Sequence, residues 1–211
     1  MVYRKKEAND WRRRVALQRH EQSREKIFLV ARELFTQSGY KEVSVEQIAQ
    51  RAGVAPATVY NRFGNKAAMA AALFEDAARA LQKAAEKDIA NGEPTESAVH
   101  RHFQRLAALT TANRTLVSAL FQAVTDYALT TAQPVSAPDP RRITPLPGPL
   151  ATILESSQVR GLRPKKIQAA HAAAMMTNAF LIRFLKGDDP KTAARECADL
   201  LLYGICGTNA R

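Results

Sequence analysis

Apolar residues recur at helical spacing along nearly the whole chain, and no long stretch alternates apolar and polar residues as a strand does. The clearest stripe lies near the N-terminus, where five residues share one face of a helix: Ile27, Val30, Ala31, Leu34 and Phe35. Gly39 follows it, at the position where helices commonly end in a left-handed residue. The pattern predicts an all-α protein whose first main helix ends near Gly39.

Two short helices are expected next. Ser44 and Gln47 fit a capping box that opens the first of them, and Gly53 ends it. Pro56 suits the first position of the following helix, where its missing N–H costs nothing, and Gly64 closes that helix. Two short helices joined by a tight turn are the arrangement of a helix-turn-helix.

The rest of the chain is expected to form longer helices. Asn65 is a good N-cap for a long fourth helix that continues to Ala90. Further helices are expected at 95–111, 113–130, 149–158, 164–186 and 190–205, and the proline-rich residues 131–148 are interpreted as a loop. This divides the chain into an arm at 1–22, a helix-turn-helix domain at 23–66 and a larger helical domain at 67–211.

The positive charge is concentrated at the N-terminal end. The net charge is +11, and residues 1–66 hold 14 Lys and Arg against 7 Asp and Glu. This asymmetry favours a polyanionic partner. The arm at 1–22 contributes Arg4, Lys5, Lys6, Arg12, Arg13 and Arg14. Such an arm can follow phosphates or enter the minor groove of DNA, or it can be a solubilising tail with no site-specific role; both interpretations stay open.

The expected third helix has a polar face opposite Val59 and Phe63 that carries Thr58, Asn61 and Arg62. Asn can form two hydrogen bonds with adenine and Arg two with guanine, in a major groove wide enough for a helix. Thr58 and Tyr60 can contact phosphates or a thymine methyl group. Lys66 lies in the first turn of the fourth helix, where the helix dipole disfavours a cation unless a phosphate docks there. The alternative is a solvated surface lysine.

Residues 44–66 (SVEQIAQRAGVAPATVYNRFGNK) closely resemble the DNA-binding region of the tetracycline-repressor-like (TetR) family. Residues 31–35 and Gly39-Tyr40 match the first helix of that family, so the resemblance covers about residues 23–70. The most specific parts are Thr58-Val59-Tyr60 and the spacing from Phe63 to Lys66. Three positions depart from the family pattern: Ala55 replaces a polar cap, Asn61 a frequent aromatic residue and Ala67 a frequent Glu.

The resemblance implies a role for each matching residue. Ser44 would cap the second helix and touch the DNA backbone. Phosphates would be held by Thr58, Tyr60 and Lys66. The base-facing surface would be formed by Pro56, Ala57, Asn61 and Arg62.

The resemblance also implies a homodimer formed by the last two helices and a palindromic DNA operator. Small residues at 169–174 permit close helix approach, and Leu200, Leu201 and Ile205 add apolar bulk, although ordinary core packing is an alternative.

The resemblance further implies a small-molecule effector, partly apolar, in a pocket within helices four to eight. The candidate lining residues, which would otherwise be plain core, are Phe103, Leu106, Leu120, Phe121, Val124, Tyr127, Met175, Asn178 and Phe180. Gln122 and Thr125 are further polar candidates. The effector would favour a conformer whose reading helices are wrongly spaced for DNA, with the fourth helix as the lever, so DNA must weaken effector binding by the same factor.

These observations, with the resemblance, predict a ligand-responsive DNA-binding transcriptional repressor that the effector releases from its operator; activation instead of repression stays open. No metal or catalytic motif is present: the histidines do not follow HExxH spacing, and neither GxSxG nor a phosphate-binding loop occurs. We therefore expect no enzyme activity, no metal and no cofactor. An architectural DNA-binding protein, or one that responds to no ligand, is the alternative. Cys197 and Cys206 are expected to be buried small residues. Neither a signal-peptide pattern nor a long apolar run occurs, so a cytoplasmic protein without membrane contact is expected.

Overall fold

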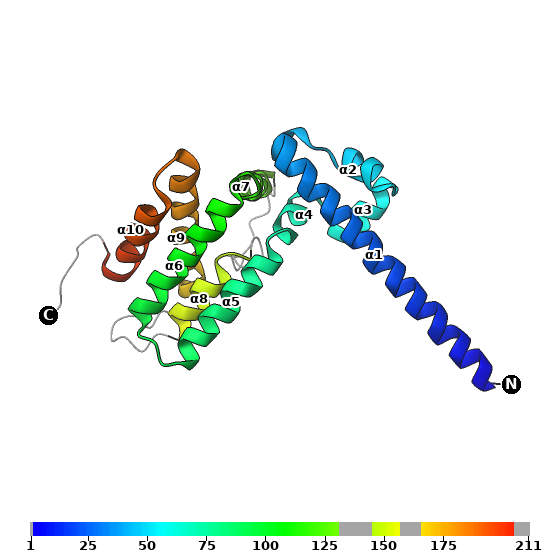
Figure 1. The fold of residues 1–211 in the computed structure, drawn as a ribbon, viewed down its shortest axis with the longest axis horizontal. Coiled ribbons are helices and arrows are strands. Elements are labelled where there is room, and N and C mark those ends of the chain that lie inside the picture. The colour runs from blue at the N-terminus through cyan, green and yellow to red at the C-terminus, as the bar shows by residue number, and fades with distance from the viewer. Residues whose placement is uncertain (1, 131–144, 157–165, 205–211) are drawn as a thin grey trace.

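The computed structural model describes residues 2–130, 145–156 and 166–204 (Figure 1). Every regular element in these ranges is an α-helix, which confirms the predicted fold class. The helices are α1 (Val2–Glu42), α2 (Val45–Ala52), α3 (Pro56–Phe63), α4 (Lys66–Ala72), α5 (Glu75–Ala90), α6 (Thr95–Ala112), α7 (Arg114–Thr130), α8 (Gly148–Glu155), α9 (Lys166–Lys186) and α10 (Pro190–Tyr203). Most of the predicted loop at 131–148 lies outside the described residues.

The helix-turn-helix forms as its local signals predict. Ser44 and Gln47 make both hydrogen bonds of the capping box at the start of α2. Gly53 ends α2 in the left-handed conformation, with φ of 66°. Ala55 precedes α3 without a side-chain cap, and Pro56 occupies its first turn. The long helix α1 is interrupted at Gly39, whose φ of 80° and ψ of 170° are not helical.

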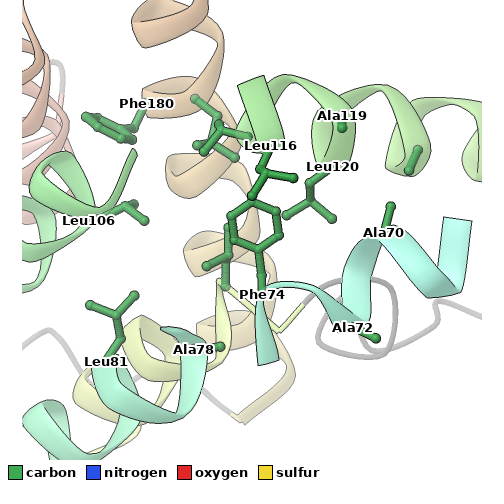
Figure 2. Close-up of a cluster of buried hydrophobic side chains, with 14 of the residues drawn as sticks. Ala70, Ala72, Phe74, Ala78, Leu81, Leu106, Leu116, Ala119, Leu120 and Phe180 are labelled. Carbon is green, nitrogen blue, oxygen red and sulfur yellow. The ribbon is translucent and has the colours of Figure 1, made fainter. Parts of the chain in front are cut away.

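The single long fourth helix predicted from Lys66 to Ala90 is wrong, because the chain breaks at Leu73 and Phe74 into α4 and α5. The two parts follow different neighbours: α4 packs against α7, whereas α5 packs against α6 and α8. Phe74 is buried at the break, beside Leu116 and Leu120 of α7 (Figure 2). Tertiary packing of this ring outweighs the helical propensity of the surrounding alanines.

One helix of the larger domain connects it to the N-terminal domain. α7 packs against both α1 and α4, and in Figure 1 it lies end-on between the N-terminal helices and the rest of the chain. Ala119 and Leu120 of α7 and Ala70 of α4 are all buried at this junction (Figure 2). The remaining core forms where α6 packs on α10, α8 on α9, and α9 on α10.

Candidate DNA-binding site

α3 is held by one apolar side, which leaves its other side outward. Val59 is 1% exposed, and the ring of Phe63 stacks on Phe28 of α1 with the centroids 6.4 Å apart. The guanidinium of Arg24 lies 5.9 Å from the Phe63 centroid and covers it. The opposite side of α3 presents Pro56, Ala57 and Asn61 to solvent, and Tyr60 is 45% exposed.

Tyr60 and Thr58 lie at the edges of this outward face. The hydroxyl of Tyr60 is 3.5 Å from Oε1 of Glu46 on α2, while Thr58 is half-buried. Ser44 is half-buried, and its hydroxyl accepts a hydrogen bond from the Gln47 amide, so it caps α2 as predicted. The structure thus leaves Tyr60 and Asn61 exposed on α3, close to the half-buried Thr58, and places Ser44 at the start of α2.

Arg62 is bound to another part of the protein. Its Nη1 donates a 2.7 Å hydrogen bond to the backbone carbonyl of His20 on α1. Its Nε is buried and has no hydrogen-bond partner among the described residues. Arg62 therefore links α3 to α1 in this conformation, and its reading of a base stays a prediction. This contact joins residues 42 positions apart, so local patterns do not reveal it.

Lys66 is half-buried and also occupied. Its ammonium donates hydrogen bonds to the carbonyls of Tyr40 at 2.9 Å and Val43 at 3.0 Å. It lies 4.2 Å from the centroid of the Tyr40 ring, within the range of a cation–π contact. The lysine thus ties the start of α4 to the end of α1 and to Val43 in this conformation, and its contact with a phosphate stays a prediction.

The candidate effector residues are mainly core. Phe103, Leu106, Leu120 and Phe180 are buried, and the Phe103 and Phe180 centroids are 6.2 Å apart. Phe121, Gln122 and Asn178 are half-buried, Thr125 is exposed, and Met175 is 70% exposed on α9. The side chains of Val124 and Tyr127 lie outside what the structure describes. A groove of about 1110 Å³ lies between α6 and α10 instead, and its described lining contains none of these candidates.

Two buried polar atoms in the larger domain stand out. Nε2 of His102 on α6 and Oγ1 of Thr177 on α9 are buried without a hydrogen-bond partner among the described residues. Burial, and secondarily the charge of Arg105, lower the pKa of His102 to about 4. Buried polar atoms in proteins nearly always have a partner. These two atoms therefore mark places where a polar group or a water molecule would gain hydrogen bonds.

The described residues contain no group of three His, Cys, Asp or Glu side chains arranged to hold a metal ion. No helix in those ranges is both long and apolar enough to cross a membrane. Cys197 is buried, and burial raises the pKa of its thiol, whereas Cys206 lies outside the described residues.

Comparison with known proteins agrees with this architecture. Residues 27–73 match the family model described as bacterial regulatory proteins, tetR family. A search of curated protein sequences finds no match. The chain is similar to the solved structure of FadR from Thermus thermophilus, a TetR-family repressor in complex with lauroyl-CoA, with 22% identity, a TM-score of 0.68, and coverage of 89% of this chain and 97% of that one.

Two further solved structures are similar. A TetR regulator from Rhodococcus sp. RHA1 has 21% identity and a TM-score of 0.59, and the match covers 88% of this chain and 98% of that one. FadR from Bacillus subtilis, in complex with stearoyl-CoA, has 20% identity and a TM-score of 0.55, with coverage of 85% and 98%. Residues 27–73 therefore match the tetR family model, in a chain that has the fold of these TetR-family structures.

Proposed function

We propose that this chain is a cytoplasmic transcriptional repressor that binds a palindromic DNA operator as a homodimer and is released by a small molecule. The observation that carries the proposal is the outward polar face of α3, which Val59 and Phe63 hold in position. α3 would enter the major groove, with Asn61 at base edges and Tyr60 and Thr58 at phosphates. The protein would act by binding alone, without catalysing a reaction.

The exposed apolar side chains of α9 and α10 support a homodimer. Met175, Ile182, Leu200 and Tyr203 are each between 41% and 70% exposed. By contrast, Ala169, Ala170 and Ala173 of the small-residue segment are fully buried within this chain, so they serve its own core. The dimer surface we propose is therefore the outer face of α9 and α10, centred on Met175 and Leu200.

The unpaired atoms of His102 and Thr177 support an effector site among α6, α7 and α9. An effector with an apolar body and one polar group would pack on Phe103 and Phe180 and satisfy one of these atoms. Because α4 is short, we assign the coupling to α7, which packs against both α1 and α4. Acyl thioesters are sensible first probes, since two similar structures hold lauroyl-CoA and stearoyl-CoA.

The DNA proposal is tested by selecting duplexes from a random library with the full chain. The selected sequences should be palindromes whose half-site centres are about 34 Å apart or a multiple of it. Affinity for the selected duplex should exceed that for random DNA by about 10³ or more. Equal affinity for the two would contradict the proposal and favour an architectural DNA-binding protein.

The role of Asn61 is tested by Asn61→Ala, with Asn91→Ala at the exposed end of α5 as the matched control. The first variant should weaken binding to the selected duplex by about 1–3 kcal/mol and relax the preference at one base pair per half-site. The control should bind as the unmodified chain does. Unchanged sequence preference in Asn61→Ala would remove this residue from base reading.

The effector proposal is tested by adding lauroyl-CoA and stearoyl-CoA to the protein–duplex complex. Release of the duplex, lost in Phe180→Ala but kept in Lys83→Ala at an exposed position on α5, would support the site. If neither probe changes duplex affinity, acyl thioesters are not effectors. If release occurs equally in both variants, the site lies elsewhere.

A further inference from the structure

The N-terminal part of α1 extends beyond the helix-turn-helix. α1 begins at Val2, and Figure 1 shows its first half projecting past α2 and α3. The hydrogen bond from Arg62 to His20 fixes α3 at that point of α1. The 18 residues from Val2 to Arg19 therefore lead away from α3 for about 27 Å, at 1.5 Å per residue. That length corresponds to about eight base pairs of duplex.

This extension is strongly basic. Between Val2 and His20 the chain has seven Lys and Arg against Glu7 and Asp10. The acidic residues along α1 up to Glu25 are Glu7, Asp10, Glu21 and Glu25, with spacings of three, eleven and four residues. Each spacing is close to a whole number of helical turns, so these acids share one side of α1 and leave most of its circumference to cations.

The basic residues continue the side of α1 that packs on the helix-turn-helix. Ile27 is fully buried on that side. Positions seven, fourteen and twenty-one residues before it are His20, Arg13 and Lys6. Seven residues are nearly two turns, with a drift of about 20° per step, so these positions stay on roughly the same side. An element that lies against α3 would therefore also pass along the side of α1 that holds positions 13 and 6.

The cations nearest the N-terminus of α1 are in an unfavourable position in the protein alone. No acidic residue lies in the first turn of α1, although Arg4, Lys5 and Lys6 are near its N-terminus, where the helix dipole repels cations. A phosphate near that end of α1 removes this cost.

We infer that the N-terminal extension of α1 is a second DNA-binding element, a basic helix that follows the phosphate backbone of the duplex held by α3. This inference rests on the proposed function, because α3 must first be docked on DNA. Contacts of this kind carry no sequence preference, but they raise affinity and its dependence on salt.

The test measures affinity of the full chain for a random duplex of about 40 base pairs across a range of NaCl concentrations. The test variant is Lys6→Gln/Arg12→Gln/Arg13→Gln, and the matched control is Lys83→Gln/Lys87→Gln/Lys191→Gln, which removes the same charge from exposed positions on α5 and α10. Log affinity falls as log salt rises, and each lost phosphate contact makes this fall less steep by about 0.9. We expect the slope to fall by about two to three in the test variant and to stay unchanged in the control.

A further variant, Lys6→Arg/Arg12→Lys/Arg13→Lys, keeps the charge and should keep the slope, which separates loss of charge from loss of fold. An unchanged slope in the glutamine variant would overturn the inference. The inference would also be overturned if the glutamine variant lost binding to phosphatidylserine vesicles but not to DNA, since this would assign the extension to a membrane surface. If the unmodified chain prefers no selected duplex over random DNA, the proposed function fails instead.

Discussion

The ammonium of Lys66, at the start of α4, bonds the carbonyl of Tyr40 and lies over the ring of the same residue, 4.2 Å from its centroid. Tyr40 is itself 3% exposed and packs against Phe35 of α1. One lysine thus connects the last turn of α1 with the first turn of α4, on either side of the helix-turn-helix.

Lys66→Met should therefore destabilise the N-terminal domain. Two hydrogen bonds from a charged donor are lost, and the carbonyls of Tyr40 and Val43 lose a donor, so we expect a cost of about 2 kcal/mol. Chemical denaturation measures it, with Lys83→Met on the exposed side of α5 as the control. A stable Lys66→Met protein whose DNA-binding salt slope falls by about one would instead assign the lysine mainly to a phosphate.

Gly53 controls the turn between α2 and α3. Its φ of 66° is unfavourable for a residue with a Cβ, although an added Cβ would meet Lys26 Nζ only at an ordinary 3.5 Å. Gly53→Ala should cost about 1–2 kcal/mol from backbone strain alone. Gly148→Ala, where an added Cβ meets nothing within 4 Å, is the control and should be close to neutral. Equal thermal stability of the two variants would contradict this explanation.

His102 makes stability depend on pH. Its pKa is about 4 in the folded chain and 6.5 as a free side chain, so the unfolded state binds a proton first as pH falls. The contribution of neutral His102 to the free energy of unfolding is therefore fully present above pH 6.5. It is lost as pH falls from 6.5 to about 4, which lowers the stability by roughly 3 kcal/mol.

Denaturation at a series of pH values should show that the stability of His102→Leu falls less steeply with decreasing pH than that of the unmodified chain. His20→Gln replaces an exposed side chain and should keep the original profile. Parallel profiles for all three proteins would show that His102 does not titrate in this way.

Asp88 on α5 holds α6 through two arginines. Arg105 donates hydrogen bonds to both carboxylate oxygens and Arg101 donates one. The hydrogen bond from Arg105 is the largest cause of a lowered Asp88 pKa, so this stabilisation is present above the ordinary value of 3.8 and is lost as pH falls through the folded value.

Asp88→Asn should cost about 2 kcal/mol at neutral pH, less than for a fully buried pair because both arginines are partly exposed. Asp199→Asn, which loses a partly exposed contact with His100, should cost less than 1 kcal/mol. If the free energies of unfolding of the two variants agreed within the error of the denaturation measurement, the Asp88 network would contribute no more to stability than the Asp199 contact does.

The sequence predicts those features whose signals are local. The capping box of Ser44 and Gln47, the left-handed Gly53 and the first-turn Pro56 each depend on neighbours within a few residues, and each forms as expected. The buried side of α3 follows from the spacing of Val59 and Phe63.

Contacts between distant segments are what local patterns miss. Nothing near Arg62 in the sequence indicates His20 as its acceptor, and nothing near Lys66 indicates the carbonyls of Tyr40 and Val43. The break at Phe74 has the same origin, because the ring follows partners on α7 while the local sequence favours an unbroken helix. Residues that looked available for DNA are therefore partly engaged by the fold itself.

The double attachment of α7, to α1 and to α4, restricts how the N-terminal domain can turn. Rotation about one attachment would strain the other, so the two must shift together. Under the proposed function, a substitution on the apolar side of α7 that touches no nucleotide would alter which half-site separation the dimer accepts. The half-site separation that the dimer accepts would then depend partly on a helix that does not contact the duplex.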